Sequence, residues 1–391
     1  MTIHLRHTDQ CAEIIVDLDA IAHNTALIAD TAGTTVLAVV KADAFGHGLV
    51  PVARTVLAHG AHWLGVTTCA EALRLRRAGI TAPVLSWMHA HDTDFAAVID
   101  AGIDLSASSI QHLRHIATCA ARTARTAFVH LKIDTGLRRN GAPPSEWPAL
   151  VAFARRLERA GRIQVRGVWS HLVHASDPGT PCVGRQVERF DHAVSAARAA
   201  GLDPELRHLA NSAAALDAPH CRYDLVRPGI GLYGVEPVAG KVFGLRAAMT
   251  LTTRTILVKR VPAGSGVSYD HDYVTTADST LALVPIGYAD GVPRAASGRA
   301  EVWSHNHRHP LAGTIAMDQF VVDLGDQPAE LGDEVVVFGP GDRGEPTVAQ
   351  WADWAGTIPH EIFTRLGHRI PRRYLGLSPA EGQLQEATYE W

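Results

Sequence analysis

The chain has 391 residues, 47% of them hydrophobic and 19% charged, and its formal net charge is −4 with neutral histidines. This composition supplies a large core and excludes a disordered chain, while the length favours one large domain together with a second one. The charge gives no reason to expect nucleic acid or a membrane as partner, and no apolar run approaches the length of a membrane span. The five cysteines form no CxxC pair and the start lacks the apolar segment of a secretory signal, so we expect a cytoplasmic protein.

The first part of the chain, 12–240, alternates short β-branched runs with longer amphipathic segments. The run at 36–40 is continuously apolar, as expected of a strand buried on both faces. Similar runs follow at 63–67, 83–88, 104–108, 127–133, 165–171, 208–211 and 225–227, with helix-like segments between them such as 19–29, 50–58, 70–78, 146–159 and 186–200. Eight strands alternating with helices predict an α/β fold of the (β/α)8 TIM-barrel type, with a doubly wound open sheet as the alternative.

The second part of the chain, 241–391, has a different texture. Gly and Pro turns separate short alternating segments at 249–258, 280–285, 301–303, 319–324 and 334–338. Hardly any helix signal appears before 348–354. We therefore expect a C-terminal, mainly-β domain that also includes residues 1–11, with the boundary near 236–246.

The predicted barrel strands end in residues suited to chemistry, and barrels of this kind collect their catalytic groups at those ends. A lysine that leaves an apolar strand is poorly hydrated, which lowers its pKa and favours the free amine that reacts with an aldehyde cofactor. Hydroxyl and backbone N–H groups after the last strands suit a phosphate. The residues are Lys41, Lys132, Arg139, His171, Asn211, Ser212, Arg227, Gly229 and Ile230.

This set predicts pyridoxal 5'-phosphate (PLP) as the cofactor. Lys41 would hold its aldehyde, Ser212 with the backbone near Gly229 and Ile230 would bind its phosphate, and Arg227 would face its ring nitrogen. Because arginine cannot practically accept a proton, the ring nitrogen would stay unprotonated and the ring would be a weaker electron sink. Such a site favours quick removal and return of a proton.

Two other patterns have simpler readings. The segment 229–234 matches the dinucleotide pattern GxGxxG, but no acidic residue follows it at the required distance. His305, His307 and His309 would share one face of a strand, but an exposed hairpin turn ending at Pro310 is favoured over a metal site. We expect no metal.

Seven blocks of the sequence, in order and over both expected domains, resemble the alanine racemase family. The segment AVVKADAFGHG at 38–48 is similar to the family's PLP-attachment motif, which is highly specific. The other blocks lie at 132–141, 211–214, 226–234, 266–269, 287–291 and 317–319.

The resemblance implies a fold-type III PLP enzyme that racemises an amino acid with two bases. Lys41 would carry the cofactor covalently and act as one acid/base. Tyr269, contributed by the partner subunit of a homodimer, would act on the opposite face of the substrate carbon, because a single base would tend to return the proton where it was taken. His171 would stack on the cofactor ring.

The resemblance also implies how the substrate is held. Arg139 would bind the cofactor's phenolic oxygen and help to place the substrate carboxylate, which would also meet the backbone N–H of Met317. Tyr288 keeps its family position in the substrate-binding set. Lys132 matches a lysine that is carbamylated in many members and that orients the arginine.

Four positions depart from the family pattern, and they bear on the substrate. Phe45 and His360 stand where tyrosines are usual, Thr314 where an arginine is usual, and Ser176 where an aspartate is usual. Loss of two hydroxyl groups at the phosphate would cost roughly 1–3 kcal/mol each if nothing replaced them. An entrance changed in this way could admit another amino acid.

The leading hypothesis is racemisation of L-alanine to D-alanine, for D-alanine biosynthesis in the cytoplasm. The alternative within the class is a paralogue that acts on another amino acid or catalyses a different PLP reaction in specialised metabolism. A rival from another class is a PLP-binding protein without catalysis. Tyr269 and the whole of 245–391 argue against that rival, because small barrel proteins of that kind lack both.

Overall fold

The computed structural model describes residues 11–177 and 180–376, which form two compact units. The barrel unit comprises Ile21–Ala44 and Gly48–Leu245, and the β unit comprises the chain up to Ala20, the segment Phe45–His47 and the chain from Arg246 onward. Residues 1–10 and 377–391, which we assigned to the β domain, lie outside the described residues.

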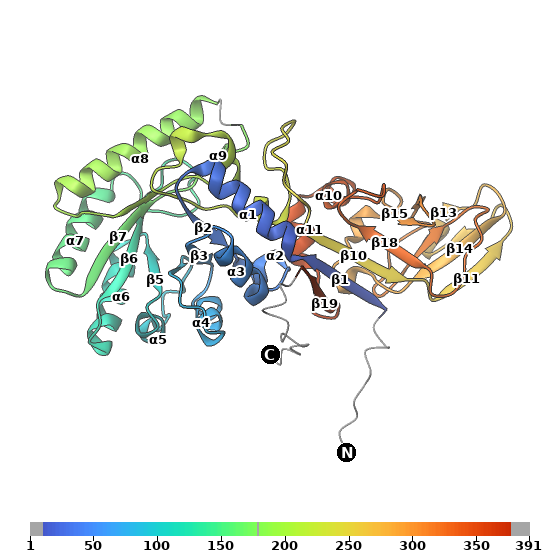
Figure 1. The fold of residues 1–391 in the computed structure, drawn as a ribbon, viewed down its shortest axis with the longest axis horizontal. Coiled ribbons are helices and arrows are strands. Elements are labelled where there is room, and N and C mark those ends of the chain that lie inside the picture. Colours follow the sequence, from blue (N-terminus) through green and yellow to red (C-terminus); the bar gives the residue numbers. More distant parts are fainter. Residues whose placement is uncertain (1–10, 178–179, 377–391) are drawn as a thin grey trace, which may run out of the picture. The chain divides into compact units, whose positions relative to one another are not determined.

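Eight parallel strands form the barrel unit, in the order β8-β7-β6-β5-β4-β3-β2-β9 (Figure 1). Backbone hydrogen bonds from Asp224 N to Arg207 O (3.1 Å) and from Arg227 N to Ala210 O (2.9 Å) join the two outer strands and bring the sheet nearly to closure. The predicted TIM-type barrel is confirmed, and the open doubly wound sheet is wrong. The strands are β2 Thr35–Val39, β3 Trp63–Val66, β4 Val84–Ser86, β5 Asp104–Ala107, β6 Ala127–Lys132, β7 Ile163–Trp169, β8 Leu206–His208 and β9 Leu225–Val226.

Helices lie around the outside of these strands (Figure 1). Because the strands are covered on both faces, they read as continuous apolar runs. Local signals fix where helices begin: Thr68 Oγ1 accepts the N–H of Glu71 (3.2 Å) while the Glu71 carboxylate accepts the N–H of Thr68 (3.0 Å), a capping box at α4. The helices are α1 Leu18–Ala32, α3 Leu49–Ala58, α4 Cys69–Arg77, α5 Ala96–Asp100, α6 Ile110–Thr123, α7 Trp147–Arg159, α8 Pro181–Ala199 and α9 Ser212–Asp217.

The β unit is mainly strand, as expected. Its largest sheet has the order β16-β15-β18-β10-β1-β19, and smaller sheets have the orders β11-β14-β17 and β12-β13. Helices α10 (Val348–Ala355) and α11 (Pro359–Arg365) complete it. The strands are β1 Ala12–Asp17, β10 Met249–Arg254, β11 Leu257–Val261, β12 Gly266–Val267, β13 Tyr273–Val274, β14 Ser279–Val284, β15 Glu301–Ser304, β16 His307–Pro310, β17 Phe320–Asp323, β18 Glu334–Phe338 and β19 Arg372–Leu375.

The first strand differs from our expectation. We placed residues from 12 onward in the barrel, but β1 pairs antiparallel with β10, with Ile14 opposite Leu251, and parallel with β19. Ile14 and Val16 are fully buried. This strand finds its neighbours in segments far along the chain, so its local pattern could not assign it to a unit.

The three alternating histidines lie in a hairpin. His305 and Asn306 form its turn with φ of 47° and 62°, so the turn comes earlier than we expected and 307–310 is the strand β16. His305 bonds Asp333 (2.9 Å), and His309 donates to the Ser304 carbonyl (3.2 Å). Nowhere in the described ranges do three or more potential metal ligands gather. No helix in those ranges has the length and apolar character needed to cross a membrane.

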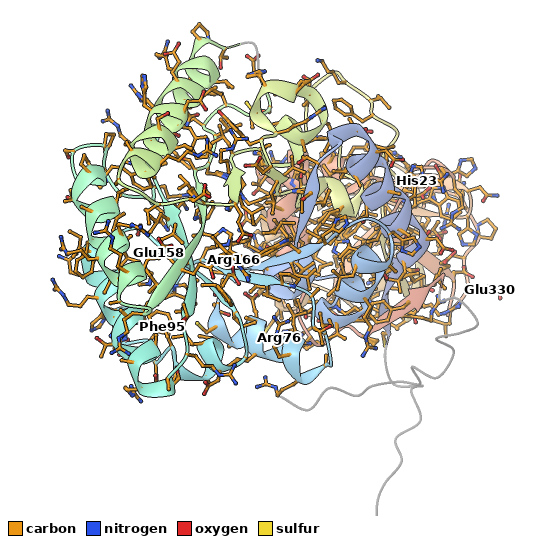
Figure 2. The ribbon with its side chains drawn as sticks, turned by 60° about the vertical axis from the view of Figure 1, so that its left-hand side comes forward. His23, Arg76, Phe95, Glu158, Arg166 and Glu330 are labelled. Carbon is orange, nitrogen blue, oxygen red and sulfur yellow. The ribbon has the colours of Figure 1, made fainter. Side chains whose placement is uncertain are left out.

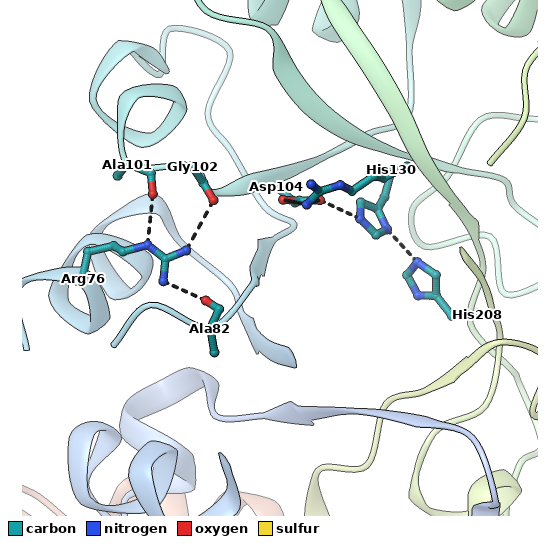
Figure 3. Close-up of polar contacts among 8 residues, drawn as sticks. Arg76, Ala82, Ala101, Gly102, Asp104, His130 and His208 are labelled. Carbon is teal, nitrogen blue, oxygen red and sulfur yellow. Dashed lines mark hydrogen bonds and ion pairs between the residues drawn. The ribbon is translucent and has the colours of Figure 1, made fainter. Parts of the chain in front are cut away.

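Arg76 lies on α4 in the barrel unit (Figure 2) and joins two loops that precede barrel strands. Its guanidinium donates to the carbonyl oxygens of Ile80 (2.8 Å), Ala82 (2.8 Å), Ala101 (3.0 Å) and Gly102 (3.3 Å), three of which appear in Figure 3. The loops lead into β4 and β5, so the arginine stabilises the end of the barrel where those strands begin.

Replacement of Arg76 should therefore destabilise the protein without touching its chemistry. Arg76→Met removes four charge-assisted bonds, and we expect a loss of about 2 kcal/mol, seen as a fall in Tm of about 4–8 °C. The exposed neighbour Arg77 is the matched control, and Arg77→Met should change stability by no more than about 0.5 kcal/mol. Equal Tm values for the two variants would show that the loops do not depend on Arg76.

Candidate active site

Lys41 follows β2 and opens a short turn, α2 (Lys41–Phe45), with an unusual backbone. Ala42, Asp43 and Ala44 have φ of 52–54° and ψ of 46–51°, in the left-handed region. Residues other than glycine rarely adopt this region, at a cost of about 1–2 kcal/mol each. Strain of this kind concentrates at functional sites, where the surroundings hold it in place.

Acidic side chains hold this turn. Asp43 Oδ1 accepts the N–H of Leu49 (3.0 Å) and a guanidinium N–H of Arg74 (3.0 Å). Glu71 Oε1 accepts the N–H of Ala42 (2.7 Å). Hydrogen bonds to charged groups are stronger than neutral ones, so these contacts offset part of the strain and fix where the Lys41 side chain leaves the strand.

Five basic side chains gather at the carboxyl end of the barrel: Lys41, Lys132, Arg139, His171 and Arg227. Burial, followed by the positive charge of Arg139, lowers the pKa of Lys41, while Glu71 opposes the shift. Burial is also the main cause at Lys132, whose pKa falls to about 7, with Arg227 and Arg139 adding to it. The result is a site with amines that readily lose their protons.

The same crowding acts on His171. Burial and the neighbouring cations, Arg227 first, lower its pKa to about 3, so its imidazole is neutral at physiological pH. A neutral ring can lie flat against another ring without adding charge. The surplus of positive charge around it favours a ligand with phosphate or carboxylate groups.

Arg227 is held rigidly at this end of the barrel. Its Nη2 donates to the carbonyls of Ser170 (2.7 Å) and Leu209 (3.1 Å), and its Nη1 contacts His208 Nδ1 (3.2 Å). Burial lowers its pKa to about 9, and its guanidinium carbon lies 4.9 Å from the Trp169 ring centroid. These contacts fix a planar donor in one orientation.

A small cradle lies beside this cluster, after β8 and β9. Ser212 Oγ accepts the N–H groups of Gly229 (2.8 Å) and Gly231 (3.2 Å), so its own hydrogen stays available for donation. Asn211 caps the following helix by accepting the N–H of Ala214 (3.2 Å). A side chain on Gly231 would approach Ser212 Cβ to 3.4 Å and Ile28 to 3.3 Å, so glycine keeps the cradle open. This donor set fits a phosphate.

Arg139 lies in a loop whose ends are tied together. Asp134 N donates to Ala142 O (2.9 Å) and Ala142 N to Lys132 O (2.8 Å). Gly141 has φ of 117°, and a Cβ there would lie 2.6 Å from Asp134 N, so the close approach needs glycine. The tight loop keeps Arg139 near Lys132, consistent with its effect on the pKa of that lysine.

Tyr269, Tyr288 and Met317 belong to the β unit, and hydrogen bonds connect their segments. Tyr288 N donates to Ala316 O (3.1 Å), and Ser268, beside Tyr269, donates to Thr314 O (3.0 Å). All three side chains are exposed in the single chain, by 64% for Tyr269, 39% for Tyr288 and 54% for Met317. These three residues form one group within the β unit.

The positions that depart from the family pattern have distinct settings. Phe45 is buried and its ring contacts that of His360, with centroids 5.7 Å apart. Thr314 is buried and donates to Asp272 (3.1 Å), whereas Ser176 is exposed. Phe45 and His360, the two positions where we expected tyrosines from the resemblance, thus contact each other.

Sequence reasoning missed several residues that support this site. Glu71 and Arg74 hold the turn after Lys41. His130 and His208 are buried in the barrel, where His208 contacts both Arg227 and His130. A signal existed for His130, which is two residues before Lys132 on β6 and so points to the same side of the strand. The spacing of Thr68 and Glu71 is a local signal for a helix start, but not for contact with the Lys41 turn, and nothing local marked Arg74 or His208.

The comparisons with known proteins cover both units. A family model of the alanine racemase N-terminal domain matches residues 16–237, and one of the C-terminal domain matches 248–374. The alanine racemase of Frankia casuarinae is 54% identical over 366 residues, 92% of this chain and 95% of that protein. The alanine racemase of Thermobifida fusca is 52% identical over 367 residues, 93% and 98% of the two chains.

Solved structures agree. The alanine racemase of D-cycloserine-producing Streptomyces lavendulae has a TM-score of 0.92 at 46% identity, covering 94% of this chain and 98% of that one. The alanine racemase of Bacillus anthracis with bound L-Ala-P has a TM-score of 0.86 at 33% identity, covering 94% and 95%. The chain therefore belongs to the alanine racemase family.

Proposed function

We propose that this protein is a PLP-dependent racemase that interconverts L- and D-alanine. Family membership over both units supports the reaction. The observation that carries the proposal is the Lys41 amine, which burial and Arg139 keep easily deprotonated at the same barrel end as the Ser212 cradle. A reactive amine and a phosphate cradle at one strand-end face are what PLP requires.

The residues present fit the cofactor group by group. Lys41 would bind the aldehyde, Ser212 and the backbone of Gly229 and Ile230 the phosphate, Arg227 the ring nitrogen, and His171 the ring face. When bound, the cofactor supplies an aldehyde that captures the substrate amine and a ring that withdraws electrons from the substrate's α-carbon. Arg227 only donates hydrogen bonds, so it leaves the ring nitrogen unprotonated.

Inversion needs two proton-transfer groups on opposite faces of the α-carbon. The Lys41 amine would take or return the proton on one face, and the Tyr269 hydroxyl on the other. Arg139 and the backbone N–H of Met317 would hold the substrate carboxylate, and Tyr288 would line the substrate site. Fixing the carboxylate points the α-hydrogen at one base or the other.

A homodimer with shared active sites would bring the second base to the first. The exposure of Tyr269, Tyr288 and Met317 in the single chain supports this arrangement, because large side chains left uncovered often mark an interface. The cysteines of the chain are free thiols, as expected in the cytoplasm, where we propose the enzyme works.

Lys41→Ala should abolish covalent attachment of the cofactor. Borohydride reduction of the wild-type enzyme, followed by peptide mass spectrometry, should locate the cofactor on Lys41. The variant should show no such adduct and should lose racemase activity by at least roughly 1,000-fold, because it lacks both the anchor and a base. A cofactor adduct on a different lysine would disprove the site assignment.

The shared site makes a second prediction, on complementation. Tyr269→Phe should keep the cofactor bound but lower racemase activity roughly 100- to 10,000-fold. When Tyr269→Phe and Lys41→Ala chains are unfolded and reassembled together, mixed dimers contain one intact site. Activity should then recover to about a quarter of the wild-type value. Sites built from one chain alone would give no recovery.

Lys132 is proposed to carry a carbamate. Its pKa of about 7 leaves a large share of neutral amine at neutral pH, and this amine can add carbon dioxide with release of a proton. Arg139 and Arg227 favour the resulting anion, whereas the Trp169 ring, 4.0 Å from Nζ, favours the ammonium form.

In 13C-bicarbonate, NMR of the wild-type enzyme should show a carbamate carbon that is missing in Lys132→Met. The signal should be present above the pKa of about 7 and fade as the pH falls below it, because protonation removes the nucleophile. A signal that survives in Lys132→Met would place the modification elsewhere, and no signal at any pH would refute it.

A further inference from the structure

A chain of hydrogen bonds crosses the barrel interior from Arg227 to Asp104. Arg227 Nη1 lies 3.2 Å from His208 Nδ1. Figure 3 shows the next two contacts: His208 Nε2 lies 2.9 Å from His130 Nδ1, and His130 Nε2 lies 3.1 Å from Asp104 Oδ2. These residues come from four strand segments: β5, β6, β8 and the end of β9. Asp104, His130 and His208 have no exposed surface.

The direction of every bond in this chain is fixed by its two ends. Arginine can only donate, so His208 accepts at Nδ1 and carries its hydrogen on Nε2. His130 must then accept at Nδ1 and donate from Nε2 to the Asp104 carboxylate. Both imidazoles are therefore in the Nε2–H form, and burial and the nearby Arg227 lower the pKa of His208 well below its usual value.

The surroundings are shaped for these two rings. A Cβ on Gly167 would lie 2.4 Å from His130 Nδ1, so only glycine at that position of β7 leaves room for the imidazole. The His208 ring stacks on Trp169, with centroids 5.5 Å apart and planes 7° from parallel. At the far end Arg166 binds both oxygens of Asp104 (3.0 and 3.2 Å).

The hydrogen-bond chain from Asp104 to Arg227 affects the electrostatics of the candidate active site. Aligned hydrogen bonds polarise one another, so the imidazole lone pairs carry the effect of the buried carboxylate toward Arg227. A buried guanidinium that lacks a counter-charge is costly. Among the described residues, the His208–His130 pair links Arg227 through hydrogen bonds to a carboxylate, that of Asp104, which Arg166 also binds.

We propose that Asp104, His130 and His208 are positioning residues that hold Arg227 in one orientation, and through it set the electronic state of the bound cofactor. This inference rests on the proposed function, in which Arg227 faces the ring nitrogen. These hydrogen bonds act on the residue that would face the cofactor, not on those that would hold the substrate. Breaking them should therefore lower kcat more than it weakens substrate binding.

Histidine-selective 15N NMR of the intact holoenzyme tests the chain itself. Two buried imidazoles should each show one protonated nitrogen, Nε2, and a coupling between the two rings across the His208–His130 bond. Either ring protonated on Nδ1, or on both nitrogens, would overturn the proposal. This readout is independent of the reaction, so it holds even if the protein does not racemise alanine.

Paired variants test the effect on the cofactor. His130→Leu removes both bonds, whereas His130→Gln retains one donor and one acceptor on the same side chain. We expect His130→Leu to shift the visible absorption band of the bound cofactor and to lower kcat about tenfold, with KM for alanine within about twofold. His130→Gln should recover much of both effects.

His112→Leu is the control, because His112 pairs with another histidine, His89 (3.2 Å), in the same barrel unit but takes no part in the hydrogen bonds between Arg227 and Asp104. It should leave the band and kcat unchanged. An unaltered absorption band in His130→Leu, or equal effects of the leucine and glutamine variants, would show that His130 acts only through packing and would refute the proposal. If His130→Leu does not fold, the NMR assignment of the wild type decides.

Discussion

The burial of several positive charges at one end of the barrel is the constraint on which the site depends. Lys41, Lys132, Arg139 and Arg227 share this end, and removing cations from water is costly unless the protein or a ligand compensates. The protein compensates in part, with carbonyls and imidazole at Arg227 and an aromatic face at Lys132. An anionic ligand would supply the rest, and the same crowding keeps the amine of Lys41 reactive.

The backbone at this end of the barrel is also strained, in the turn that follows Lys41. The left-handed turn after Lys41 is unfavourable on its own, and Asp43 and Glu71 hold it through bonds to backbone N–H groups. The strained turn lowers the stability of the fold but orients the Lys41 side chain, and hydrogen bonds of residues that take no part in the reaction offset part of this cost. Arg76 stabilises the opposite end of the barrel, where β4 and β5 begin and where no catalytic residue is expected.

Much of the architecture could be predicted from the sequence because buried parallel strands leave continuous apolar runs, and because strand ends in a barrel meet at one face. The cationic cluster followed from the same rule. The position of β1 could not be predicted, since its partners β10 and β19 are remote in sequence. The buried histidines were missed for a related reason: a histidine within an apolar strand looks like an ordinary core residue until its partners on other strands are known.

Inversion of alanine at this site would require removal and return of its α-proton. The most direct test incubates the purified holoenzyme with L-alanine in deuterated water and measures chirality and α-deuteration together, beside a panel of other L-amino acids. We expect D-alanine that carries deuterium at its α-carbon, formed at a higher rate than the product from any other amino acid in the panel. L-alanine that stays unchanged and undeuterated, while serine or a basic amino acid is turned over, would contradict it.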